Sequence, residues 1–380
     1  MEYSSIMWAA LYGQEGTARK ALDNDGIDTA KYGSALLLAV ENGHSAVARL
    51  LLDRKAFSTS AKKPLKAAIL HGDVEIVKML LENGFDPNRR HPAFRGRESA
   101  LHLAVRWGRE EVLRLLLAIK DINKRCDDGQ DYGYAPTLDE LMESLSPIME
   151  ACSRGTERML KIILEKTGFG PSCRAKWGAK LLIQAAGDAN VEVVKFLLGL
   201  EGLDPNGKDE NGWTPLFSAA ANGWGEDPET QCCRRAEIIK LLLSQKGVDP
   251  NSSYSVTALG VAVLSGRRSI VKAFLESKRV NADSKNSHGR TALSFAAQSG
   301  REDIVKWLLA RKDVNPDSKD NDGRTPLAYA LMNDNSQTQR PYGQSREKKA
   351  VIELLKEYSS PLGNGAVKQE TDPQLPESAG

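Results

Sequence analysis

The stretch from Gly202 to Asp209 is the part of the sequence that comes nearest to a chemical motif, because it spells Gly-x4-Gly-Lys. In a phosphate-binding loop, backbone N–H groups and a lysine bind phosphate, a following Ser or Thr binds magnesium, and a strand leads into the loop. Here Asp209 stands where the hydroxyl is required. The stretch is also rich in turn-forming residues. We therefore interpret it as a turn and not as a nucleotide site.

The cysteines and histidines offer no better site. The adjacent pair Cys232 and Cys233 could act as a redox pair or as half of a metal site, but no further Cys or His lies close to it in sequence. The remaining cysteines, Cys126, Cys152 and Cys173, lack CxxC spacing, and the five histidines fit neither HExxH nor a Ser/His/Asp pattern. We expect reduced thiols, no cofactor, no metal and no catalysis.

The composition is that of a folded protein without a dominant charge. Of 380 residues, 41% are hydrophobic and 27% are charged, as in globular domains. The 52 Lys and Arg nearly balance the 50 Asp and Glu, so no overall field favours direct binding of nucleic acid or of an anionic membrane. No basic stretch precedes an apolar run at the N-terminus, and no run of 18 apolar residues occurs. We expect a soluble intracellular protein that is cytoplasmic, nuclear or both.

A short phrase recurs along the chain and organises it. Its plainest copies are Thr214-Pro215-Leu216, Thr291-Ala292-Leu293 and Thr325-Pro326-Leu327, followed on schedule by small residues, a glycine and an aliphatic run. The Leu or Ile of the phrase recurs after 34 residues at four of eight steps, which indicates a tandem repeat. The anchors are Leu36, Leu65, Leu101, Ile148, Leu182, Leu216, Leu259, Leu293 and Leu327.

Each part of the phrase favours a pair of helices. Thr or Ser accepts a hydrogen bond from the free N–H groups of a first helical turn, and Pro has its φ preset for a helix start. Leu and the small Ala residues recur at i, i+3 and i+4, which places them on one face. The glycine permits the left-handed turn that ends the helix. Because neither helix can bury its apolar stripe alone, consecutive repeats must stack.

This pattern resembles the ankyrin repeat, a unit of about 33 residues with two antiparallel helices and a β-turn. Linkers such as Gly247-Val248-Asp249-Pro250-Asn251 are similar to those of ankyrin arrays in filamentous fungi. The resemblance implies an all-α fold, an ankyrin-repeat α-solenoid of helix-turn-helix units with short β-turn loops. It predicts about ten repeats over residues 1–357 and a disordered tail over residues 358–380. The polar ends of such an array favour a monomer.

The chain departs from the family pattern in several places. Ala189 stands where the sixth repeat should have its glycine, which leaves the geometry of that turn open. Only Leu101-His102 keeps the histidine that braces loops in the family, so we expect weaker bracing. Insertions, the second with a short amphipathic helix, are expected near residues 89–97, 125–145, 224–235 and 335–348.

The resemblance also implies that partners bind at loop tips and just before the helix-ending glycines. Trp107 is our first choice, because Trp and Arg dominate interface energies; the alternative is that it packs against the neighbouring repeat. The basic loop at residues 89–97 could bind an acidic partner or simply be solvated. Trp8, in an apolar helical run, is expected in the core. The candidate partner-binding residues are Trp107, Arg106, His71, Arg154, Trp177, Trp213, Arg290, Arg89, Arg90, Arg95 and Arg97.

These features favour a non-catalytic scaffold or adaptor that binds a partner protein. A transcriptional coregulator that reaches DNA only through a bound factor is the alternative, because similar fungal arrays sometimes accompany biosynthetic gene clusters. A third class, an enzyme with an unrecognised site in the insertions, would show turnover that survives removal of the partner.

Overall fold

The described part of the chain consists of helices joined by short turns. In this computed structural model it forms twenty helices and no β-strand, in agreement with the predicted all-α fold. None of these helices is long and apolar enough to cross a membrane. Contacts group the chain into an N-terminal part, Met1–Gly207, and a C-terminal part, Lys208–Gly380. The structure describes residues 4–23, 29–54, 63–88, 99–119, 147–154, 156–167, 169–221, 229–251, 256–332 and 344–359.

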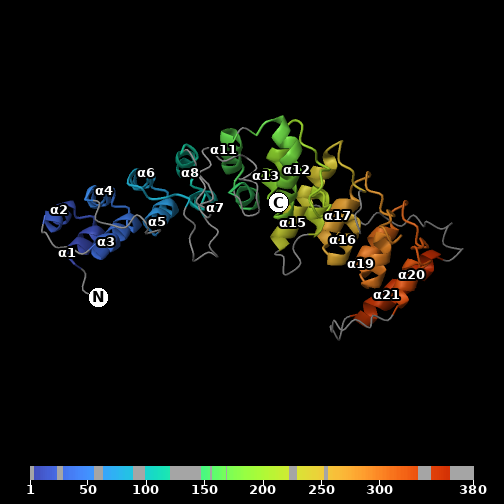
Figure 1. The fold of residues 1–380 in the computed structure, drawn as a ribbon. Helices are drawn as coiled ribbons and strands as arrows, with labels where there is room; N and C mark the ends of the chain where they lie inside the picture. The colour runs from blue at the N-terminus through green and yellow to red at the C-terminus, as the bar shows by residue number, and fades with distance from the viewer. Residues whose placement is uncertain are drawn as a thin grey trace, which may run out of the picture. The chain divides into compact units, whose positions relative to one another are not determined.

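The N-terminal part is a succession of stacked helix pairs (Figure 1). Each pair has a first and a second helix. The first helices are α1 Ser5–Tyr12, α3 Thr29–Glu41, α5 Lys63–His71, α7 Ala100–Arg106, α10 Pro147–Ser153 and α12 Pro171–Gly187. The second helices are α2 Glu15–Asp23, α4 Ser45–Asp53, α6 Val74–Glu82, α8 Glu110–Leu117, α11 Glu157–Thr167 and α13 Val191–Leu198. Each first helix contacts the next first helix, and each second helix contacts the next second helix. Since α7 contacts α10 directly, the long insertion between them leaves the stack continuous.

The C-terminal part follows the same scheme. Its first helices are α14 Pro215–Ala221, α16 Ala258–Ser265, α18 Ala292–Gln298 and α20 Pro326–Leu331. Its second helices are α15 Glu229–Ser244, α17 Arg268–Leu275, α19 Glu302–Leu309 and α21 Gln344–Ser359. The contacts again run from first helix to first helix and from second to second. The anchor residues Leu216 and Leu293 are buried between these layers.

Threonines begin the first helices of the C-terminal part, as the sequence predicts. Thr257 Oγ1 accepts a hydrogen bond from Gly260 N (3.0 Å), and Thr325 Oγ1 accepts one from Ala328 N (3.2 Å). Each bond satisfies one of the N–H groups that a first helical turn leaves without a helical partner. The recurring Thr therefore fixes where each helix starts.

Residues with positive φ end the first helices. Gly43 and Gly266 have φ of 71° and 67°, the left-handed region that glycine adopts without strain. A Cβ on Gly266 would clash with the guanidinium carbon of Arg301, whereas one on Gly43 would meet nothing within 4 Å. Ala189, where the sequence left the turn open, has φ of 59°. The turn thus keeps the left-handed geometry even though a Cβ disfavours it.

Helices extend into the insertions expected in the C-terminal part. Residues 229–235, predicted to lie in the insertion at 224–235, form the first turns of α15, and residues 344–348, predicted in the insertion at 335–348, begin α21. No Gly or Pro interrupts the sequence from 229 to 244, so α15 extends beyond the repeat pattern.

Other boundaries fall largely outside the described residues. The insertions expected near 89–97 and 125–145 lie there, and so does the predicted tail from residue 360 onward. Helix α21 runs to Ser359, two residues beyond the predicted end of the array.

Trp8 is exposed, and the prediction that it lies in the core is wrong. It is 48% exposed and stacks on Tyr12, with ring centroids 5.1 Å apart. The buried residues of α1 are Ile6, Ala9 and Ala10. Trp8 and Tyr12 are four residues apart and therefore share a different face of the helix.

Replacing Leu216 with Ala should lower the free energy of unfolding by about 2 to 5 kcal/mol, because the buried side chain would leave a cavity. Chemical denaturation followed by circular dichroism measures the change. Leu331→Ala is the control, since Leu331 is 55% exposed. Equal stability of the Leu216 variant and the parent protein would contradict the stacked core.

Replacing Gly266 with Ala should destabilise the protein more than replacing Gly43 with Ala. Both variants force a Cβ into the left-handed region, which costs about 1 to 2 kcal/mol, but only at Gly266 must the side chain of Arg301 also move. Denaturant midpoints of the two variants test the order. The same loss in both would show that the close approach of Arg301 adds nothing.

Candidate functional site

His71, Arg106 and Trp107 lie at the ends of neighbouring helices. His71 is the last residue of α5 and Arg106 is the last residue of α7, and these helices contact each other. Trp107 follows directly, and its backbone N–H donates to Leu103 O (3.0 Å). The residue is 54% exposed, so its ring does not belong to the core between repeats.

Arg106 forms an ion pair that the repeat pattern does not predict. Its Nε lies 2.7 Å from Glu150 Oε1 on α10, and Arg154 Nε lies 4.0 Å from the same oxygen. The side chains of Glu150 and Arg106 are 16% and 28% exposed, whereas that of Arg154 is 69% exposed. The pair therefore ties α7 to α10, and Arg154 stays open to solvent.

Polar contacts continue from α10 to the end of α12. Ser153 Oγ donates to Asp188 Oδ2 (2.5 Å), and Gln184 Nε2 donates to Ser153 Oγ (3.0 Å). Three successive repeats thus carry a row of bonded polar side chains. Sequence reasoning missed this polar row, for which the i,i+4 spacings of Glu150 with Arg154 and of Gln184 with Asp188 are the local signals. The polar row consists of Arg106, Glu150, Ser153, Gln184 and Asp188.

Side chains at the start of second helices cap the C-terminal ends of first helices in the preceding repeat. Arg109 Nε donates to Leu70 O (2.9 Å), and Asn190 Nδ2 donates to Cys152 O (3.1 Å). These carbonyls belong to the last turns of α5 and α10, where the helix itself supplies no N–H partner. The bond from Arg109 therefore fixes the turn that follows His71.

Trp177 and Trp213, the other two tryptophans predicted to bind a partner, belong to other repeats than Trp107 does. Trp177 is half-buried on α12, with the Nζ atoms of Lys176 and Lys180 at 4.8 Å and 5.6 Å from its ring centroid. Trp213 belongs to the C-terminal part and lies beside Phe217, with ring centroids 5.2 Å apart. Neither tryptophan is as exposed as Trp107.

Arg290, also predicted to bind a partner, is engaged between repeats. Its guanidinium carbon lies 4.1 Å from the ring centroid of Phe295 and 4.0 Å from that of Tyr329. Its Nη2 donates to Gln298 Oε1 (2.5 Å). Burial lowers the pKa of Arg290, an effect that the neighbouring Tyr329 and Asp320 oppose. These contacts between α18 and α20 are enough to explain the position of the Arg290 side chain, and no bound partner protein is needed to explain it.

The described residues offer little material for a metal site. Across this portion of the chain, no group of three or more His, Cys, Asp or Glu side chains could hold a metal ion. Burial, with a smaller effect from Asp188, raises the pKa of the Cys152 thiol far above its usual range. The basic-loop residues Arg89, Arg90, Arg95 and Arg97 lie outside the described residues, and their role stays a prediction.

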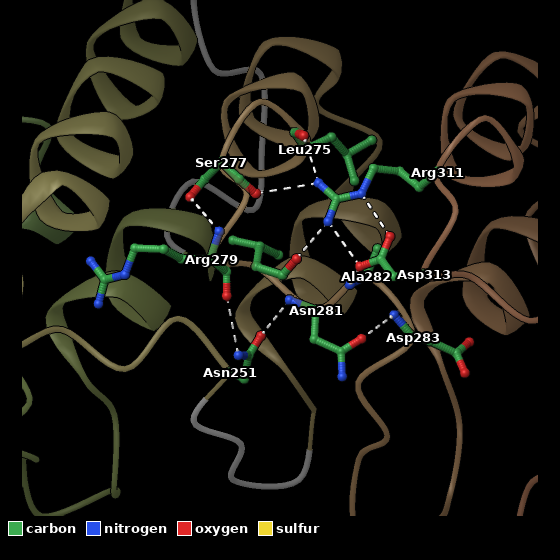
Figure 2. Close-up of polar contacts among 10 residues, drawn as sticks. Asn251, Leu275, Ser277, Arg279, Asn281, Ala282, Asp283, Arg311 and Asp313 are labelled. Atoms are coloured by element: carbon green, nitrogen blue, oxygen red, sulfur yellow. Dashed lines mark hydrogen bonds and ion pairs between the residues drawn. The ribbon is translucent and has the colours of Figure 1, made fainter.

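In the C-terminal part, two arginines tie each loop to the loop before it. Arg279 Nη1 donates to Leu243 O and Gln245 O, both at 2.7 Å. Arg311 occupies the same position one repeat later. Its Nη1 donates to Leu275 O (2.8 Å), as Figure 2 shows. Each guanidinium thus satisfies carbonyls at the end of the preceding second helix.

Two further side chains strengthen this bracing (Figure 2). Asp313 accepts two hydrogen bonds of 2.8 Å from Arg311, which lower its pKa to about 2. Asn251 accepts from Asn281 N (2.8 Å) and donates to Arg279 O (3.4 Å). The loops here are braced by Arg, Asp and Asn in place of the family histidine, which the sequence pattern did not lead us to expect.

The chain is similar to segments of several larger proteins. It is 28% identical over 169 residues to the human transient receptor potential cation channel subfamily A member 1, covering 42% of this chain and 13% of that protein. It is 28% identical over 170 residues to ankyrin repeat and SAM domain-containing protein 6 of Danio rerio, covering 43% and 21%. It is 27% identical over 135 residues to glycerophosphocholine phosphodiesterase gde1 of Schizosaccharomyces pombe, covering 34% and 10%. The chain therefore matches only a minor share of each relative.

Family models cover the repeats themselves. The model described as "Ankyrin repeats (3 copies)" matches residues 6–91 and, in overlapping segments, residues 148–340. The model described as "Ankyrin repeat" matches residues 97–127. These matches take in more than half of the 380 residues, and they coincide with the stacked helix pairs. The chain belongs to the ankyrin repeat family.

Proposed function

We propose that the chain is a non-catalytic scaffold or adaptor that binds a partner protein through the helix ends around Trp107. The observation that carries the proposal is the 54% exposure of this large side chain, at a position where the family resemblance implies partner contact. Contact between water and an indole ring is unfavourable, so covering the ring with a partner releases free energy.

The surroundings of Trp107 are ordered for binding. Arg106 is held by Glu150, and Arg109 fixes the preceding turn through Leu70 O. A surface whose side chains are already fixed loses little conformational freedom on association. The exposed guanidinium of Arg154 lies at the same edge and can bond a carboxylate of the partner.

The relatives support a binding role for the ankyrin segment, because the proteins that contain it differ in their named activities. By name they include a cation channel, a SAM-domain protein and a phosphodiesterase, and the chain matches between 10% and 21% of the length of each. Because one scaffold occurs in proteins with such different names, the shared segment favours binding over catalysis.

A transcriptional coregulator is the narrower alternative and differs only in the partner. Isolation of partners on the immobilised full chain, followed by mass spectrometry, separates the two hypotheses. A transcription factor captured through Trp107 identifies a coregulator, and any other protein captured in this way identifies an adaptor.

Replacing Trp107 with Ala should weaken binding of that partner by about 2 kcal/mol or more, roughly thirtyfold in Kd. Thermal unfolding should stay almost unchanged, because the ring is mostly in water. Biolayer interferometry with the purified partner measures Kd.

Trp8→Ala is the matched control for this test, because Trp8 is similarly exposed, at 48%. Arg106 is left in place, since its removal would also break the ion pair with Glu150. A Kd that is unaffected by Trp107→Ala would exclude this surface.

A further inference from the structure

Three lysines occupy the same position in three successive loops of the C-terminal part. The loops read Lys246-Gly247-Val248-Asp249, Lys278-Arg279-Val280-Asn281 and Lys312-Asp313-Val314-Asn315, with the lysines 32 and 34 residues apart. Val248 and Val280 are buried and Val314 is half-buried, so the three loops pack toward the core at equivalent points. All three lysines are exposed. We name Lys246, Lys278 and Lys312 the lysine strip.

The lysines of the strip are not paired with carboxylates. Beside the strip in sequence, Glu276 pairs with Lys240 (2.8 Å) and Asp313 pairs with Arg311 (2.8 Å). Within the described residues, none of the three lysines of the strip forms an ion pair. Three positive charges therefore face solvent at corresponding points of adjacent repeats.

The loops that carry the strip are held in register. Arg279 bonds carbonyls of the loop that contains Lys246, and Arg311 bonds Ser277 O (3.2 Å) and Val280 O (2.7 Å) of the loop that contains Lys278. The guanidinium of Arg279 bonds backbone carbonyls, so its positive charge adds to that of the strip. A ligand would meet cations whose backbone is already fixed, which lowers the entropic cost of binding.

The spacing of the strip fits an extended peptide. Stacked helices pack about 8 to 10 Å apart, so equivalent loop residues recur at roughly that interval. An extended chain rises about 3.3 Å per residue, and three residues span roughly 10 Å. We propose that the lysine strip binds an extended acidic segment of a partner protein that carries a carboxylate at about every third residue.

Nucleic acid fits the strip less well. A duplex places a charge at about every 1.7 Å of its axis, far more densely than one lysine per repeat. The formal charge of the whole chain is +2, which supplies no long-range field to attract a polyanion. The acidic peptide is therefore the favoured occupant.

The proposal can be tested with a fluorescent peptide of repeated Ser-Gly-Glu units and the full-length protein. Fluorescence anisotropy at low ionic strength gives Kd. The triple variant Lys246→Gln, Lys278→Gln and Lys312→Gln should bind about tenfold more weakly, because three exposed ion pairs are lost. The control triple Lys208→Gln, Lys319→Gln and Lys349→Gln removes the same charge from other exposed positions and should bind like the parent.

Three results would overturn the proposal. They are an equal loss in both triple variants, equal binding of a peptide with its glutamates in one block, and tighter binding of an oligothymidine or of anionic vesicles. Circular dichroism melts of both triples verify that the fold is kept. Trp107→Ala should leave peptide binding unchanged, so the strip and the surface around Trp107 succeed or fail separately.

Discussion

Burial of apolar helix faces between successive repeats is the constraint on which the rest of the structure depends. Leu36, Leu101, Leu216 and Leu293 are buried because neighbouring helix pairs cover them, and no pair of this kind has a core of its own. The same stacking decides which surface residues meet, since equivalent positions of adjacent repeats must lie side by side. Both the polar row and the lysine strip follow from this repetition, although neither forms part of the core.

Stacking also determines how the backbone groups at helix ends are satisfied. Arg109, Asn190, Arg279 and Arg311 each come from one repeat and donate to carbonyls of the repeat before it. Removing a repeat would therefore expose both the apolar faces and the polar helix ends of its neighbour. Both the lost apolar burial and the lost hydrogen bonds would lower the free energy of unfolding. The side chains that stabilise the array thus also hold its loops in place.

The sequence predicted whatever one repeat can specify by itself. The threonine caps and the turn glycines depend on neighbours a few residues away, and both were predictable. The buried anchors depend on the adjacent repeats, but the recurring phrase marks the same position in each repeat and so identified them as well. The ion pair of Arg106 and Glu150 was not, because it joins residues 44 positions apart across an insertion and exists only once α7 stacks on α10. The prediction that Trp8 lies in the core was wrong for a related reason. An apolar run identifies a helix, but the neighbouring repeat decides which of its faces is covered.

The two proposed surfaces would differ in the physical step that they control. Around Trp107, Arg106 is paired with Glu150 while Arg154 stays exposed, so binding there would depend mainly on the apolar area of Trp107 and would respond to salt chiefly through Arg154. The lysine strip has exposed charges and little apolar surface, so its contribution is screened at about 10 Å in 0.1 M salt. Buried apolar anchors mainly set dissociation rates, whereas exposed charges mainly set encounter rates. If the chain is the adaptor proposed above, it would adjust the lifetime of a complex and its speed of formation through separate residues.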